Sequence, residues 1–314
     1  MTFTACDAEA PEEERRAARS IESSEAPGGA PEDPGPSEPA DETPDPETSS
    51  PASGKGAYVL GARLPGRPAS LSRALERVHA DLSNDVDRWL ARGGALHGPL
   101  VARIQREALF QQRLYRKMAR DPRLARASLR LLDGPLRRRA TANFEAGYGL
   151  SAGLQPLEPP IRLETIKPEP PKRLLSFYEE AQRRYRVDWT ILAAINFIET
   201  RFGRILGPSP AGALGPMQFL PSTWKQYGNG GDIRDPRDAI LGAARYLRAS
   251  NVLTNPRAAV FAYNRSDAYV EAVLTYARQM AQRPQTFYEY YFWQVFVRTT
   301  KGDVQLTGPG ATDR

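Results

Sequence analysis

The stretch that most constrains the fold is an apolar segment from Trp189 to Phe202 that contains a single carboxylate. Its apolar side chains recur at the three- and four-residue spacing of a helix, and further apolar residues cover the opposite face. We therefore expect a helix that is buried nearly all round. Asp188 is expected to cap its start and Gly203 to end it. Glu199 lies on the buried face of this helix.

The environment of Glu199 leaves two interpretations open. An ionised and unpaired carboxylate in such a helix costs several kcal/mol. The positions three and four residues away hold Ile195, Asn196, Phe202 and Gly203, so a local ion pair is excluded. Glu199 is then either a structural glutamate paired with a distant arginine, or a carboxylic acid that stays protonated near neutral pH and acts as a general acid.

A glycine- and proline-rich loop follows this helix. Gly212, Gly215 and Pro216 are typical of a backbone that approaches a ligand closely. Met217 and Gln218 come directly after them, before the next short helix. A loop of this kind behind a buried acid favours the general-acid interpretation.

Three motifs carry a resemblance to a known family. They are Glu199-Thr-Arg-Phe-Gly203, Gly212-Ala-Leu-Gly-Pro-Met-Gln-Phe219 and Ala262-Tyr-Asn264. In this order and spacing they resemble the motifs of bacterial lytic transglycosylases, which share the lysozyme-like fold with goose-type lysozyme. The version here is most similar to the domain of actinobacterial cell-wall proteins, and the resemblance covers about a third of the chain, roughly from residue 174 to residue 280.

The resemblance implies a reaction and a site. The reaction is non-hydrolytic cleavage of the β-1,4 bond between N-acetylmuramic acid (MurNAc) and N-acetylglucosamine (GlcNAc), which leaves a 1,6-anhydro-MurNAc end and uses no cofactor. Glu199 would protonate the leaving oxygen and then, as a carboxylate, deprotonate the muramoyl 6-hydroxyl. By the family pattern, Met217 and Gln218 line the glycan groove. Tyr263 is expected to hydrogen-bond Glu199, and Asn264 to contact the sugar or the loop backbone.

Two other functions stay open, a goose-type-lysozyme-like muramidase that uses water and a non-catalytic cell-wall-binding protein. An inverting hydrolase needs a second carboxylate to activate the water. No acidic residue lies between Glu199 and Asp232. Asp235, Asp238 and Asp267 are explained by the helix starts beside them, so only Asp232 lacks an evident structural role. We therefore expect the transglycosylase reaction.

The charge of the chain is strongly asymmetric. Residues 1–56 hold 14 acidic and 4 basic residues, a net of −10, whereas the rest hold 39 basic and 23 acidic residues, a net of +16. Such a basic body suits a polyanionic partner. Because no nucleic-acid-binding signature is present, we expect peptidoglycan strands and anionic cell-wall polymers as partners, no nucleic acid, a monomer, and an extracytoplasmic location in the cell envelope.

Cysteine and histidine are too few for other cell-wall chemistry. The chain has one cysteine, Cys6, and two histidines, His79 and His97, all outside the motif region. A zinc amidase or a Cys/His peptidase is therefore not expected. The segment from Asn229 to Asp238 is too short for a calcium loop, so the sequence predicts no metal site.

The N-terminal segment has two features of interest, a Pro-rich tract and a cysteine near its start. Residues 7–56 are rich in Pro, Glu, Ser and Ala, which predicts a disordered and extended tether. Phe3-Thr-Ala-Cys6 resembles the tail of a bacterial lipoprotein signal, with Cys6 as the lipidated residue. This requires a start codon upstream of Met1, since no apolar region of sufficient length precedes the cysteine. The alternative is a chance cysteine in a disordered leader.

The chain is expected to be mainly α-helical, with a lysozyme-like catalytic domain, a helical N-terminal extension and a short C-terminal β-hairpin. The extension should hold four helices, over about residues 70–91, 99–119, 121–132 and 135–148. Aromatic and β-branched residues from Phe287 to Thr299 predict the first strand of the hairpin. The expected parts are an acidic Pro-rich leader (1–56), a helical region (57–154), a Pro-rich connector (155–171), the catalytic domain (172–282), and the hairpin with a tail (283–314).

Overall fold

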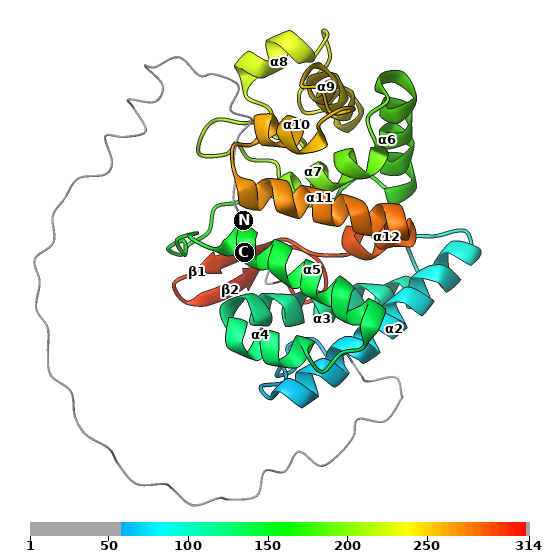
Figure 1. Ribbon diagram of the computed structural model, residues 1–314, viewed down its shortest axis with the longest axis vertical. Coiled ribbons are helices and arrows are strands. Elements are labelled where there is room, and N and C mark those ends of the chain that lie inside the picture. The colour runs from blue at the N-terminus through cyan, green and yellow to red at the C-terminus, as the bar shows by residue number, and fades with distance from the viewer. Residues whose placement is uncertain (1–57, 312–314) are drawn as a thin grey trace, which may run out of the picture. The chain divides into compact units, whose positions relative to one another are not determined.

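The computed structural model describes residues 58–311, and from Leu60 onward they belong to one compact unit. The predicted tether and Cys6 lie outside the described residues. The unit is mostly helical with one small two-stranded sheet, as Figure 1 shows, so the expected mainly α-helical class is confirmed. Among the helices of residues 58–311, none is both long and apolar enough to span a membrane.

The helical region before the connector contains the four predicted helices. Each begins with a proline in its first turn, where the fixed φ of proline suits a helix and its missing N–H costs nothing. Helix α3 packs against both α2 and α5, and α4 packs against α2. The bounds are α2 Pro68–Ala91, α3 Pro99–Arg120, α4 Pro122–Leu129 and α5 Gly134–Ser151.

The region with the three motifs is a cluster of helices around α7. Side chains of Asp188, Asp235, Asn255 and Ser266 each accept a backbone N–H at a helix start, which satisfies donors that the helix itself leaves unpaired. Helix α7 contacts α6, α9, α11 and α12 and lies behind α11 in Figure 1. The bounds are α6 Pro171–Tyr185, α7 Trp189–Thr200, α8 Pro221–Tyr227, α9 Pro236–Ala249, α10 Pro256–Tyr263 and α11 Asp267–Gln282.

Burial of α7 agrees with its apolar sequence. Every residue from Thr190 to Thr200 is buried, including Glu199. The helix ends because Arg201, Phe202 and Gly203 all adopt positive φ, a left-handed run that breaks the helical hydrogen-bond ladder. The predicted buried helix and its stop are both confirmed.

The C-terminal hairpin is shorter than predicted. The aromatic run begins with a helix, α12 Gln285–Tyr291, and only Phe296–Thr299 (β1) and Gly302–Gln305 (β2) form strands. They pair antiparallel, with Val297 opposite Val304. The assignment of a strand from Phe287 was wrong because aromatic residues favour strands only through the surface they pack against. Here α12 buries them against α2, α7 and α11.

The proline-rich connector pairs with the C-terminal hairpin and with the segment after α7. At its start, the Leu157 N–H donates at 2.9 Å to the carbonyl oxygen of Arg298, a residue of β1. Further on, the Ile166 N–H donates to Arg204 O at 2.9 Å, just after α7. These two backbone contacts hold the connector as extended chain along the compact unit.

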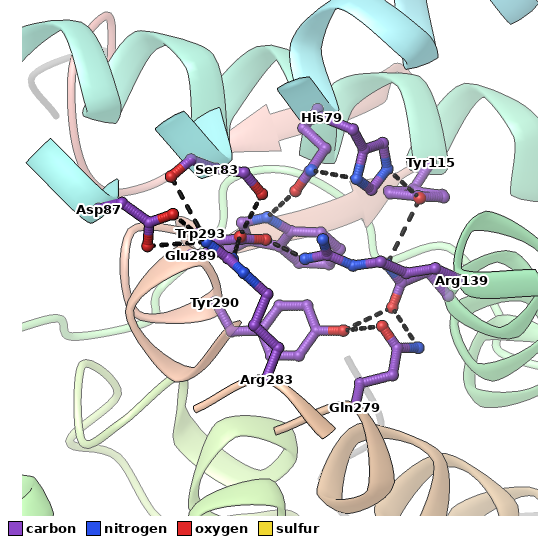
Figure 2. A network of polar contacts seen from close by, with 12 residues as sticks. His79, Ser83, Asp87, Tyr115, Arg139, Gln279, Arg283, Glu289, Tyr290 and Trp293 are labelled. Carbon is purple, nitrogen blue, oxygen red and sulfur yellow. Dashed lines mark hydrogen bonds and ion pairs between the residues drawn. The ribbon is translucent and has the colours of Figure 1, made fainter. Parts of the chain in front are cut away.

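A buried polar network joins the N-terminal helices to α12 (Figure 2). Glu289 is 1% exposed. Its carboxylate accepts from Ser83 Oγ at 3.0 Å and forms ion pairs with Arg139 and Arg283. Glu289 lies on α12, and its partners come from α2, α5 and the residue after α11, so one buried anion links α12 to all three.

The network continues toward α3. Tyr290 Oη lies 2.7 Å from Asn143 Oδ1 and 2.8 Å from Gln279 Oε1. Trp293 Nε1 donates to Gln111 Oε1 at 3.0 Å. Residues 60–154 therefore pack onto the later helices as part of the same unit, while the domain boundaries given above stay a prediction.

Candidate active site

Glu199 is a buried acid with one hydrogen bond. Glu199 is 1% exposed. Tyr269, on α11, donates its hydroxyl to Glu199 Oε1 at 2.6 Å. Glu199 Oε2 is buried, and within residues 58–311 it has no hydrogen-bond partner. An acid that still has one unoccupied oxygen can exchange a proton with a ligand that reaches it.

Burial raises the pKa of Glu199 from 4.5 to about 8, because the ionised form loses its hydration. The hydrogen bond from Tyr269 acts in the opposite direction, since it favours the carboxylate. No ion pair of Glu199 is found in the described part of the chain, so its interpretation as a paired structural glutamate finds no support there. At pH 7 the group is mostly protonated, as a general acid must be.

The loop that carries the second motif is a tight turn. Leu214 and Phe219 exchange two backbone hydrogen bonds at 2.8 and 2.9 Å, and the Gln218 N–H donates to Gly215 O at 3.0 Å. Gly215 has φ +75°, and a Cβ there would lie 1.8 Å from Ile233 O. Only glycine fits this position, because both the backbone conformation and the close approach exclude a side chain.

Side chains from α7 and α10 hold this loop by its carbonyl oxygens. Asn196 Nδ2 and Thr200 Oγ1 both donate to Pro216 O at 2.7 Å. The Tyr263 hydroxyl donates to Met217 O, also at 2.7 Å. Two consecutive carbonyl groups are thereby fixed, which ties the loop to the helix that carries the buried acid.

The four residues predicted to bind substrate are all buried. Met217 and Tyr263 are 0% exposed, and Gln218 and Asn264 are 1% exposed. Gln218 has φ +50°, and its Nε2 donates to Gly215 O at 3.0 Å. Hydrogen bonds of Tyr263 and Gln218 to loop carbonyl oxygens support the loop. Whether the four residues contact a glycan strand stays a prediction.

The tyrosine that reaches the acid is Tyr269, where the sequence pattern led us to expect Tyr263. The Tyr263 hydroxyl is donated to the loop instead. The two tyrosines lie on different helices, since α10 ends at Tyr263 and α11 begins after the cap at Ser266. The sequence offered one signal for Tyr269, its place on the apolar face of α11, but that signal indicates core packing only.

Asp232 has a structural role that the sequence did not reveal. Its Oδ1 accepts the Arg234 N–H at 2.8 Å, and its own N–H donates to Asp238 Oδ2 at 3.0 Å. The residue is exposed. These bonds are those of a turn before a helix, so this acid has a local explanation like the others. Within residues 58–311, no three His, Cys, Asp or Glu side chains form a group that could hold a metal ion.

Comparisons with known proteins agree with this arrangement. Residues 176–285 match the family model described as the transglycosylase SLT domain. Over 117 residues the chain is 33% identical to membrane-bound lytic murein transglycosylase F of Thiobacillus denitrificans, covering 35% of this chain and 24% of that protein. Over 120 residues it is 31% identical to membrane-bound lytic murein transglycosylase F 1 of Alkalilimnicola ehrlichii, covering 36% and 24%.

The matched segment spans about a quarter of the length of these curated relatives. No significant match to a solved structure was found. The match contains Glu199, the Gly215 loop, Tyr263 and Tyr269. The chain therefore carries a transglycosylase SLT domain with a lysozyme-like helical fold, and the resemblance of its three motifs to bacterial lytic transglycosylases is confirmed.

Proposed function

We propose that this protein is a peptidoglycan lytic transglycosylase. The observation that carries the proposal is the buried Glu199, whose pKa of about 8 keeps it protonated at neutral pH. Support comes from the anchored loop beside α7 and from the match to the transglycosylase SLT domain. The substrate is the glycan strand, at the bond between MurNAc and GlcNAc.

The reaction uses one carboxyl group twice. Glu199 donates its proton to the glycosidic oxygen while the bond from that oxygen to the muramoyl anomeric carbon breaks. The resulting carboxylate takes the proton of the muramoyl 6-hydroxyl, whose oxygen bonds to the anomeric carbon and closes the 1,6-anhydro ring. The acid is regenerated, and no water is consumed. An internal hydroxyl needs no second base to position it, because it is already held near the reacting carbon.

In this proposal Tyr269 is a positioning residue. Its hydrogen bond of 2.6 Å orients Glu199 through Oε1 and leaves Oε2 for the substrate. The same bond stabilises the carboxylate that forms after the first proton transfer. Met217, Gln218 and Asn264 are assigned to the wall of the glycan groove, and Tyr263 supports that wall through the Met217 carbonyl.

The second candidate is a muramidase that hydrolyses the same bond. It requires a carboxylate that activates water, and Asp232 is the acid to consider. Its engagement in a turn at the surface disfavours that role. A non-catalytic wall-binding protein is disfavoured by the intact buried acid.

The nature of the products tests the proposal. Purified protein is incubated with peptidoglycan, and the released muropeptides are analysed by mass spectrometry. We expect products one water lighter than those of a lysozyme, with anhydro ends and no new reducing ends. Reducing-end muramic acid as the main product would instead identify a hydrolase, and Asp232→Asn would then be the next variant.

Two variants with the same chemical change test the acid. Glu199→Gln is nearly isosteric but cannot transfer a proton, and general acid–base catalysis contributes about 10²–10⁴ in rate. We expect this variant to lose lytic activity while it keeps the fold. Glu145→Gln, on the exposed face of α5, is the matched control and should retain full activity. Near-normal clearing of a peptidoglycan gel by Glu199→Gln would refute the assignment.

The location that suits this activity is the cell envelope. The relatives are named as membrane-bound, and the net charge of +16 over residues 57–314 suits anionic wall polymers. Lipidation of Cys6 is one route to the membrane. Fractionation of cells that express the native gene tests both ideas, since Cys6→Ser should release the protein from the membrane if Cys6 is lipidated.

A further inference from the structure

A cavity that the proposed reaction does not use lies beside α7. Its volume is about 120 Å³, and one enclosed water needs only about 10–15 Å³ by the same measure. Ile198 and Arg201 line it, whereas Glu199 does not. The remaining walls come from α3, α5, α11 and the hairpin, so the N-terminal helices complete a space that the catalytic helices alone would not enclose.

The charge around this cavity is strongly positive. Four arginines line it, and Asp303 is the only acidic residue among the lining residues. Arg116 donates to both carboxylate oxygens of Asp303 at 2.8 and 2.6 Å, and Arg120 forms an ion pair with the same group. Within the described residues no ion pair is found for Arg201 or Arg298. One carboxylate therefore balances only part of the charge of the four guanidinium groups that line the cavity.

Arg201 is half-buried and packs against α7. Its guanidinium lies 4.2 Å from the centre of the Phe197 ring, and one of its terminal nitrogens donates to Phe197 O at 2.8 Å. Its Nε is buried and, among residues 58–311, has no hydrogen-bond partner. The pKa of Arg201 is lowered to about 10, mainly by burial; Tyr276 acts in the opposite direction, and the positive charges of Arg116 and Arg204 contribute to the lowering. An anion in the cavity would relieve this repulsion.

Aromatic residues form another wall, and the network of Figure 2 holds two of them in place. Tyr115 Oη lies 2.7 Å from His79 Nε2, and the Trp293 indole donates to Gln111 at 3.0 Å. Tyr115, Trp293 and Tyr276 all line the cavity. Rigid aromatic walls beside guanidinium groups suit an organic anion with an apolar part more than a bare inorganic ion.

We propose that this cavity binds the free carboxylates of the short peptides that branch from peptidoglycan glycan strands. The planar fork of arginine matches a carboxylate in two parallel hydrogen bonds, and the aromatic wall takes the aliphatic parts of the peptide. This inference rests on the proposed function, because it assumes that peptidoglycan is the substrate. The protein would then bind the peptide in this cavity and cleave the glycan strand at Glu199.

The test uses a peptide without any sugar, so that binding does not depend on cleavage. The probe is N-acetyl-L-alanyl-D-glutamate, and its diamide is the uncharged counterpart. Binding to the full chain is measured by calorimetry. Arg298→Gln removes a charge from an exposed strand position that lines the cavity. Arg278→Gln removes the same charge from the exposed face of α11, away from the cavity, and is the matched control.

We expect the dicarboxylate to bind the wild type and Arg278→Gln equally, and to bind Arg298→Gln about tenfold or more weakly, the effect of one charged hydrogen bond. The diamide should not bind. Equal binding of diamide and dicarboxylate, equal binding by the two variants, or tighter binding of inorganic phosphate than of the peptide would each overturn the inference.

The two proposals fail separately. Binding of the dicarboxylate without any cleavage of peptidoglycan would refute the activity and leave the anion site standing. Cleavage without binding would refute the anion site and leave the activity standing. Glu199→Gln should bind the dicarboxylate as the wild type does, because Glu199 does not line the cavity.

Discussion

Replacing Glu199 by glutamine should change how the stability of the protein depends on pH. The pKa of Glu199 is about 8 in the folded protein, and its ordinary value is 4.5. Between these two pH values the folded state holds a proton that the unfolded state has lost. Stability contributed by this group therefore falls as the pH rises. Glutamine has nearly the same shape and does not titrate.

The size of the effect follows from the difference in pKa. Each pKa unit corresponds to about 1.4 kcal/mol. The wild type should thus lose about 1.4 kcal/mol of stability per pH unit between pH 4.5 and pH 8 relative to Glu199→Gln, and about 5 kcal/mol in all. Below pH 4.5 the difference should be constant, because both states are protonated. Above pH 8 it should be constant again.

Urea unfolding of both proteins at half-unit steps from pH 4 to pH 9 measures this difference. Burial also raises the pKa of Glu107 to about 8. This group and other buried groups are present in both proteins, so their contributions cancel in the subtraction. Glu145→Gln makes the same substitution on an exposed face and should show no comparable trend. A difference between wild type and Glu199→Gln that does not vary with pH would refute the idea that burial keeps this acid protonated.

Three further predictions test the hydrogen bond to the acid, the buried network of Glu289 and the close approach at Gly215. Tyr269→Phe removes a hydrogen bond to the carboxylate, worth about 1.5–3 kcal/mol, so the pKa of the buried acid should rise by about 1–2 units. The basic limb of the pH profile of kcat/KM should move upward equally, and an unchanged limb would contradict the role of Tyr269. Glu289→Gln leaves two arginines without their buried anion and should cost about 3–5 kcal/mol in urea unfolding. Its control, the exposed Glu271→Gln, should cost at most about 1 kcal/mol, and equal losses would contradict the network. Gly215→Ala should cost at least about 3 kcal/mol, because its Cβ would overlap a backbone oxygen. Gly212→Ala, which has the same sign of φ and open space around it, should cost only about 1–2 kcal/mol, and similar thermal unfolding of the two variants would contradict the close approach.

The sequence by itself determined most features that depend on near neighbours along the chain. Apolar spacing identified α7 and the burial of Glu199, and the capping residue Asp188 marked the start of α7 correctly. The loop sequence indicated a backbone that allows a close approach, but only the structure shows that Gly215 approaches Ile233 O. Each of these inferences uses contacts within a few residues, where helical geometry and turn chemistry leave few alternatives.

Tertiary structure decided the features that depend on distant residues. Tyr269 reaches Glu199 from 70 positions away, and nothing local distinguishes it from Tyr263. The aromatic run of α12 became a helix because distant helices cover it. The arginine-lined cavity draws on α3, α5, α7, α11 and the hairpin at once. Spacing along a chain specifies which residues share one element, but only the packing of elements against each other determines which side chains meet.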